Sequence, residues 1–91
     1  MSLKMRYTLH EAAEKIGLEP DTIIRFVSYE WIDPVEWGSQ LLDEEDIARA
    51  RLILELQENF GVNEEAVPVI LHLIDQLNRA SLDLKKLTKD D

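Results

Sequence analysis

Apolar residues recur at helical spacing in four stretches of the chain, which are separated by short polar, glycine or proline segments. In the first stretch, residues 9–16, the apolar positions fall on one face of a helix. Thr8 and Glu11 form a capping-box pattern at its start, and Gly17 is typical of the left-handed cap that ends a helix. The pattern therefore predicts a first helix over residues 9–16.

The second stretch, residues 20–30, begins with a proline, which is well tolerated in the first turn of a helix. Its residues divide between an apolar face, which we expect to point into the core, and an outer face. The apolar face holds Ile23, Phe26 and Val27, and the outer face holds Asp21, Ile24, Arg25 and Ser28. Two short helices joined by a tight turn at Gly17 predict a helix-turn-helix.

Residues 31–42 lack a helical pattern because an Asp-Pro pair and a Gly-Ser pair interrupt them. We expect residues 35–37 and 40–42 to pair as a two-stranded wing that packs on a tryptophan. A third helix is predicted from Asp43, a good N-cap followed by acidic residues, to about Asn59.

A fourth helix is predicted from a cap at Asn63, and from residue 70 its apolar residues are spaced 3, 4, 3, 4 and 3 apart. They are Ile70, Leu73, Leu77, Ala80, Leu84 and Leu87. Such a stripe is typical either of packing within one chain or of a dimer seam, and the spacing leaves both open. We expect a homodimer through this helix, because the chain offers few other helices to cover it.

These elements predict a mainly all-α fold, with a small two-stranded wing and a long C-terminal helix. We divide the chain into an N-terminal segment at 1–5, a helix-turn-helix core at 6–61, and a C-terminal helix at 62–91 with a frayed end. The first three residues resemble a cloning remnant, with Met5 as an alternative start.

The chain is strongly acidic, with 10 Lys and Arg against 19 Asp and Glu and a formal net charge of -9. Phosphate backbones and anionic lipids repel such a chain, so we expect a basic protein surface as partner, and neither nucleic acid nor a membrane. No apolar run is long enough to span a bilayer. The absence of cysteine fits a cytoplasmic location.

Catalytic and metal chemistry find little support in the sequence. There is no cysteine, no glycine-rich phosphate loop and no readable Ser-His-Asp set. His72 and Asp75 share a helix face, but two ligands are too few for a metal site, and His10 lies on another predicted helix. Residues 43–46 lack the spacing of a calcium loop. We therefore expect no enzyme activity, no cofactor and no metal.

The order of these elements resembles the winged-helix DNA-binding domain of the MerR regulators, with matching stretches at residues 7–13, 17–23 and 42–47. In that family an apolar residue after the second-helix Thr precedes an Arg that touches DNA phosphate. Here Ile24 stands at the position of that Arg, and Asp21 stands where a basic residue is common. Through Asp46 the chain has four basic and eleven acidic residues, a net of -7, which opposes phosphate contacts.

A MerR-like fold without its basic residues, at this length, resembles the CbpM family of chaperone modulators over about residues 6–87. The segment 31–34 resembles that family's segment ahead of the wing. The resemblance implies binding to the J-domain of a DnaJ-like co-chaperone, CbpA, and inhibition by covering its Hsp70-docking surface. The alternative is a MerR-like DNA-binding transcriptional regulator.

The outer face of the second helix is the predicted partner site, because a DNA-binding relative would carry basic residues there. Acidic residues on the first helix extend it as a rim, and Glu45 with Asp46 is the next candidate. The predicted partner-binding residues are Glu11, Glu14, Asp21, Ile24, Arg25 and Ser28.

Overall fold

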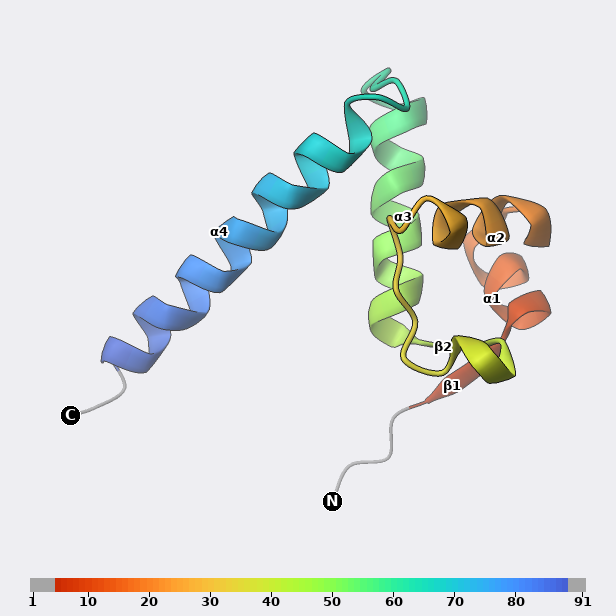
Figure 1. The fold of residues 1–91 in the computed structure, drawn as a ribbon, viewed down its shortest axis with the longest axis horizontal. Helices are drawn as coiled ribbons and strands as arrows, with labels where there is room; N and C mark the ends of the chain where they lie inside the picture. The colour runs from red at the N-terminus through yellow and green to blue at the C-terminus, as the bar shows by residue number, and fades with distance from the viewer. Residues whose placement is uncertain (1–4, 89–91) are drawn as a thin grey trace. The chain divides into compact units, whose positions relative to one another are not determined.

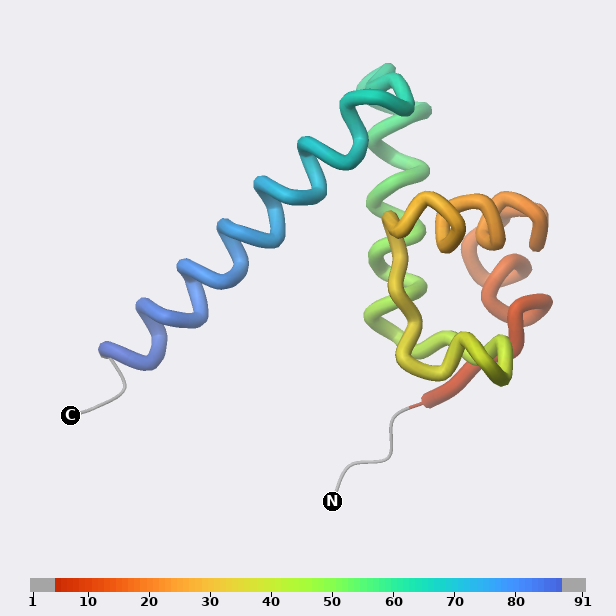
Figure 2. Tube along the Cα trace, viewed as in Figure 1, coloured from red at the N-terminus to blue at the C-terminus, as the bar shows by residue number. Residues whose placement is uncertain are grey.

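A computed structural model describes residues 5–88 of the chain, so the expected frayed end and most of the N-terminal segment lie outside the described residues. The elements run in the order shown in Figure 1 and traced in Figure 2. They are β1 (Arg6–Thr8), α1 (Leu9–Ile16), α2 (Pro20–Ser28), the 3-10 helix η1 (Trp37–Ser39), β2 (Leu41–Asp43), α3 (Glu44–Glu58) and α4 (Val67–Thr88). They form two compact units, one ending at Gly61 and the other beginning at Val62.

Helix α1 has the predicted bounds and the predicted caps at both ends. The Glu11 amide donates to Thr8 Oγ1 at 3.1 Å, and the Thr8 amide donates to Glu11 Oε1 at 2.9 Å. Gly17 has a φ of 87°, and its amide donates to the Ala13 carbonyl at 2.8 Å. Both ends of α1 thus follow from local sequence chemistry.

Helix α2 ends at Ser28, two residues before the predicted end at residue 30. Glu30 takes a left-handed conformation with a φ of 63°, and its amide donates to the Val27 carbonyl at 2.9 Å. The Trp31 amide donates to the Phe26 carbonyl at 3.0 Å. This bonding is a Schellman cap, and it ends the helix without the usual glycine.

The two-stranded antiparallel sheet is present, but one of its strands is not the predicted one. β2 pairs with β1, with Arg6, Tyr7 and Thr8 opposite Asp43, Leu42 and Leu41. The expected hairpin between residues 35–37 and 40–42 is therefore wrong. Its first run turns instead of extending, because the Gln40 amide donates to the Trp37 carbonyl at 2.8 Å and Gln40 takes a φ of 54°.

The first unit is built around a core that α1, α2, β2 and α3 share. The core cluster consists of Ala12, Ala13, Ile23, Leu42 and Ile47, with Tyr7, Leu9, Ile16, Leu18 and Trp37 packed against it. On α3, Ala50 and Ile53 are fully buried, and Leu54 is half-buried. The mainly helical winged helix-turn-helix fold is confirmed.

A second capping box joins the sheet to α3 at the predicted N-cap. The Asp46 amide donates to Asp43 Oδ1, and the Asp43 amide donates to Asp46 Oδ2, both at 2.9 Å. The last residue of β2 is therefore also the cap of α3. This arrangement fixes the direction in which α3 leaves the sheet.

Helix α4 begins at Val67, four residues after the predicted cap. Asn63 caps the preceding turn instead, since the Ala66 amide donates to its Oδ1 at 3.0 Å. Pro68 has no amide hydrogen with which to bond back to the Glu64 carbonyl. The regular helical ladder therefore starts only after that turn, with Pro68 in the first turn of α4.

Candidate functional site

The structure places the predicted outer face of α2 on the surface. Asp21, Ile24, Arg25 and Ser28 are all exposed, whereas Ile23 on the opposite face is buried. The exposed fraction of Ile24 is 39%. This face thus offers a carboxylate, an aliphatic side chain and a guanidinium, and it could contact a protein surface of mixed character.

Two of the six predicted partner-binding residues also have structural roles. The Glu11 carboxylate accepts the Thr8 amide hydrogen in the α1 capping box. The Ser28 hydroxyl donates to the Arg25 carbonyl at 2.8 Å. Glu14, like Glu11, is exposed on α1. Substitution of Glu11 would therefore disturb the helix cap, so Asp21 and Ile24 are the cleaner residues for testing this face.

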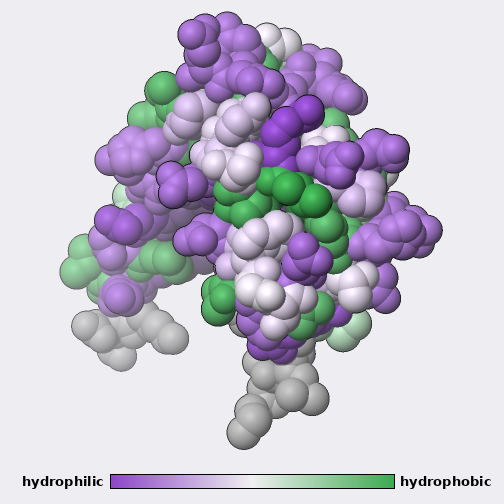
Figure 3. Space-filling model, turned by 45° about the vertical axis from the view of Figure 1, so that its right-hand side comes forward, coloured by the Kyte–Doolittle hydropathy of each residue, from purple (hydrophilic) through white to green (hydrophobic). Residues whose placement is uncertain are grey.

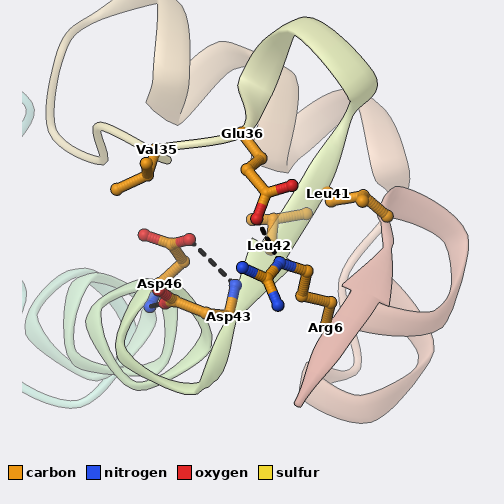
Figure 4. A pocket seen from close by; sticks show the side chains of 7 residues that line it. All are labelled: Arg6, Val35, Glu36, Leu41, Leu42, Asp43 and Asp46. Carbon is orange, nitrogen blue, oxygen red and sulfur yellow. Dashed lines mark hydrogen bonds and ion pairs between the residues drawn. The ribbon is translucent and has the colours of Figure 1, made fainter. Parts of the chain in front are cut away.

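A cavity of about 100 Å³ lies in the same unit, where β1, β2, the first turn of α3 and the segment before η1 meet (Figure 4). It is lined by Arg6, Val35, Glu36, Leu41, Leu42, Asp43 and Asp46. In Figure 4, the side chains of Arg6, Val35, Glu36 and Asp46 stand around one opening. The Arg6 guanidinium and the Glu36 carboxylate form an ion pair on one side of it.

Burial and neighbouring charge both act on Asp46 at this cavity. Partial burial raises the pKa of the Asp46 carboxyl, and the carboxylates of Asp43 and Glu45 raise it further. The hydrogen bond from the Asp43 amide acts in the opposite direction, because it stabilises the charged form. Negative charge is therefore crowded at the start of α3, which the sequence marked only as a second candidate surface.

A further acidic contact lies beside the sheet. The Tyr7 hydroxyl donates to Glu44 Oε1 at 2.6 Å, and this hydrogen bond raises the pKa of Tyr7. The Lys15 ammonium lies 5.4 Å from the centre of the Tyr7 ring, within reach of a cation–π interaction. Tyr7 thus links β1 to both α1 and α3.

Most of the apolar stripe predicted on α4 is exposed. The exposed fractions are 57% for Leu73, 69% for Leu77, 62% for Leu84 and 75% for Leu87. Ala80 is also exposed, and Ile70 is half-buried. An apolar helix face of this length is a candidate surface for another protein chain. On the face drawn in Figure 3, hydrophilic residues surround smaller apolar areas.

Other kinds of site find no support in the part of the chain that the structure describes. Among residues 5–88, no three His, Asp or Glu side chains come together as metal ligands, so His72 and Asp75 gain no third partner. None of the helices in this range combines the length and apolar character needed to cross a bilayer.

The cavity could not be found from the sequence, because Arg6 lies 29 or more residues before the rest of the lining and meets it only after β1 pairs with β2. The one local signal was Val35, an apolar residue between a proline and a glutamate. The sequence pattern, however, predicts Val35 in a strand of the wing.

Comparison with known families gives one result. A family model described as MerR HTH family regulatory protein matches residues 7–89, which cover most of both compact units. No curated protein and no solved structure matches the chain.

Proposed function

The chain belongs to the MerR HTH family of regulatory proteins, and from this premise we propose that it is a non-enzymatic protein-binding module of the cytoplasm. We further propose that it acts as the CbpM-like resemblance implies. It would bind the J-domain of a DnaJ-like co-chaperone and inhibit that protein by covering its Hsp70-docking surface.

The observation that carries this proposal is the character of the exposed face of α2. Where a DNA-binding relative would present basic side chains, this face presents the Asp21 carboxylate and the Ile24 side chain beside a single cation, Arg25. A net charge of -9 adds a repulsion toward nucleic acid that acts over the whole molecule. The helix-turn-helix fold is retained, but its surface chemistry favours a basic protein partner.

The electrostatics also favour a particular division of roles within the face. Exposed carboxylates such as Asp21 attract a basic partner at long range and mainly raise the association rate. An apolar side chain such as Ile24 acts only after contact, so its loss mainly raises the dissociation rate. A basic helix of a J-domain fits both contributions.

The competing function is a DNA-binding regulator, and the description of the matched family, MerR HTH family regulatory protein, fits either function. A gel shift with duplex DNA at low salt separates the two, because low salt maximises any attraction to phosphate. We expect no binding at physiological salt. Sub-micromolar binding to duplex DNA there would favour the regulator and overturn the proposal.

We also propose that the chain forms a homodimer through α4. The support is the exposed 3,4-spaced stripe that includes Leu73, Leu77, Leu84 and Leu87. This spacing is that of a coiled-coil seam, in which two helices bury the same stripe against each other.

Two substitutions on α2 test the proposed partner site. Asp21→Lys should lower the association rate with the J-domain and weaken its salt dependence, and Ile24→Arg should raise the dissociation rate. Each should weaken binding by roughly tenfold, since one well-placed interface residue contributes more than about 1 kcal/mol. Stopped-flow mixing and calorimetry measure these quantities.

The matched control is Glu58→Lys, which makes the same charge change at an exposed position at the end of α3. Circular dichroism should show all three variants folded. If both α2 variants bind the J-domain as the wild type does, the outer face of α2 is not the site.

A further inference from the structure

The cavity at the junction of β1, β2 and α3 has a size that limits what can occupy it. Its volume of about 100 Å³ is well below the roughly 300–1,000 Å³ of pockets that hold small molecules and cofactors. It is nevertheless larger than the roughly 30 Å³ share of one water molecule. Within residues 5–88 no group of metal ligands exists either. One protein side chain is the occupant of matching size.

The charge of the lining selects the type of side chain. The lining carries three carboxylates, those of Glu36, Asp43 and Asp46, and one guanidinium, that of Arg6, so its formal charge is negative. A further cation would therefore find excess negative charge. The raised pKa of Asp46 agrees with this excess, because its causes include the charges of Asp43 and Glu45.

The rim supplies an apolar contact as well. Val35 is 91% exposed, although it is a large apolar residue far from either end of the chain. In Figure 4 it stands beside Asp46, across the opening from Glu36 and Arg6. Lysine and arginine lay their alkyl stems on apolar surface while their charged ends reach polar groups. Val35 and the carboxylates together match both parts of such a side chain.

We infer that this cavity binds one lysine or arginine side chain of a partner protein, with the alkyl stem on Val35 and the charged end among Glu36, Asp43 and Asp46. This inference rests on the proposed function, which supplies the kind of partner: a protein with a basic surface. It adds a second contact site, at the β2–α3 junction, to the outer face of α2.

The test uses the whole chain and a defined basic probe, deca-lysine, with deca-arginine as a second probe and deca-glutamate as a negative control. In two-dimensional NMR titrations we expect saturable shifts centred on residues 35–36 and 43–46. Val35→Lys should weaken deca-lysine binding by roughly tenfold, because it places a like charge on the rim. Because Val35 is highly exposed, this substitution should leave the fold unaffected.

Phe60→Lys is the matched control, since it adds the same charge at another exposed apolar residue of the same unit. It should bind deca-lysine nearly as the wild type does. If Val35→Lys and Phe60→Lys bind deca-lysine equally, the attraction comes from overall charge and the cavity is not a site.

Repeating the comparison with the J-domain separates this inference from the proposed function. If the J-domain does not bind the wild type while deca-lysine still occupies the cavity, the proposed partner is wrong and the site stands. If the J-domain binds the wild type and Val35→Lys equally well, the inference is overturned and the proposed function stands. Weaker J-domain binding by Val35→Lys than by Phe60→Lys supports both.

Discussion

The two units of the chain bury their helical apolar residues to different extents. In the unit that ends at Gly61, the apolar faces of three short helices are buried, and Ile53 on α3 has an exposed fraction of 0%. On α4, Val67 and Leu71 are buried, but the leucines of the 3,4-spaced stripe remain mostly exposed, and Leu77 is 69% exposed. Helical periodicity thus predicts which face of a helix is apolar, but it does not predict what covers that face.

The difference also separates stability from function. Burial of apolar surface stabilises the first unit, so its buried residues are constrained by packing. The exposed stripe of α4 contributes little to the stability of a single chain. Its regular spacing is the support for the proposed homodimer. Substitutions in each unit test this difference.

The largest expected effect is in the first unit. Ile53→Ala should lower the free energy of unfolding by about 2–5 kcal/mol, because it leaves a cavity in a closed core. Urea denaturation followed by circular dichroism measures it. Leu73→Ala on α4 is the matched truncation, and in dilute protein it should change this free energy by only about 0.5 kcal/mol or less. Equal losses from the two substitutions would remove the contrast between the units.

The second prediction tests what covers the stripe of α4. Leu77→Glu should convert the dimer to monomer, because burying an unpaired charge in the seam costs about 3 kcal/mol or more. Sedimentation velocity over a range of protein concentrations measures the change. Asn78→Glu adds the same charge one position away, outside the stripe, and should leave the dimer intact. A wild-type chain that sediments as a monomer at high micromolar concentration would exclude the dimer.

Most of the local structure could be predicted from the sequence, because its causes are local. The Thr8–Glu11 capping box, the left-handed Gly17 and the Asp43 cap each depend on residues within four positions of one another. The outer face of α2 followed from helical periodicity alone, and its residues are exposed as predicted.

The features that the sequence did not predict correctly have non-local or competing causes. β2 pairs with β1, about 35 residues earlier in the chain, and a strand of three residues has too few positions to show an alternating pattern. Pro68 delayed the start of α4 by removing one amide hydrogen. The cavity beside Val35 exists only once β1, β2 and α3 have met, so no local pattern predicts it.

The smallest expected effect concerns the carboxyl group of Asp46, which is partly buried in the first unit. Burial raises the pKa of Asp46 above its ordinary value, and the nearby Asp43 and Glu45 carboxylates raise it further. The charged side chains of Arg6 and Glu36 line the same cavity. Between the ordinary and the raised pKa, the folded chain therefore binds more protons at Asp46 than the unfolded chain does. In that window the free energy of unfolding must fall as the pH rises.

Asp46→Asn removes the titrating group while keeping a side-chain oxygen that can accept the Asp43 amide hydrogen. The stability of the wild type relative to this variant should therefore decrease as the pH rises from about 3 to about 7. Urea denaturation of both proteins at several pH values measures the difference. Asp21→Asn, which removes an exposed carboxylate on α2, controls for net charge. If the wild type instead gains stability relative to Asp46→Asn with rising pH, the amide hydrogen bond outweighs burial. The crowded negative charge at the cavity would then be compensated within the chain.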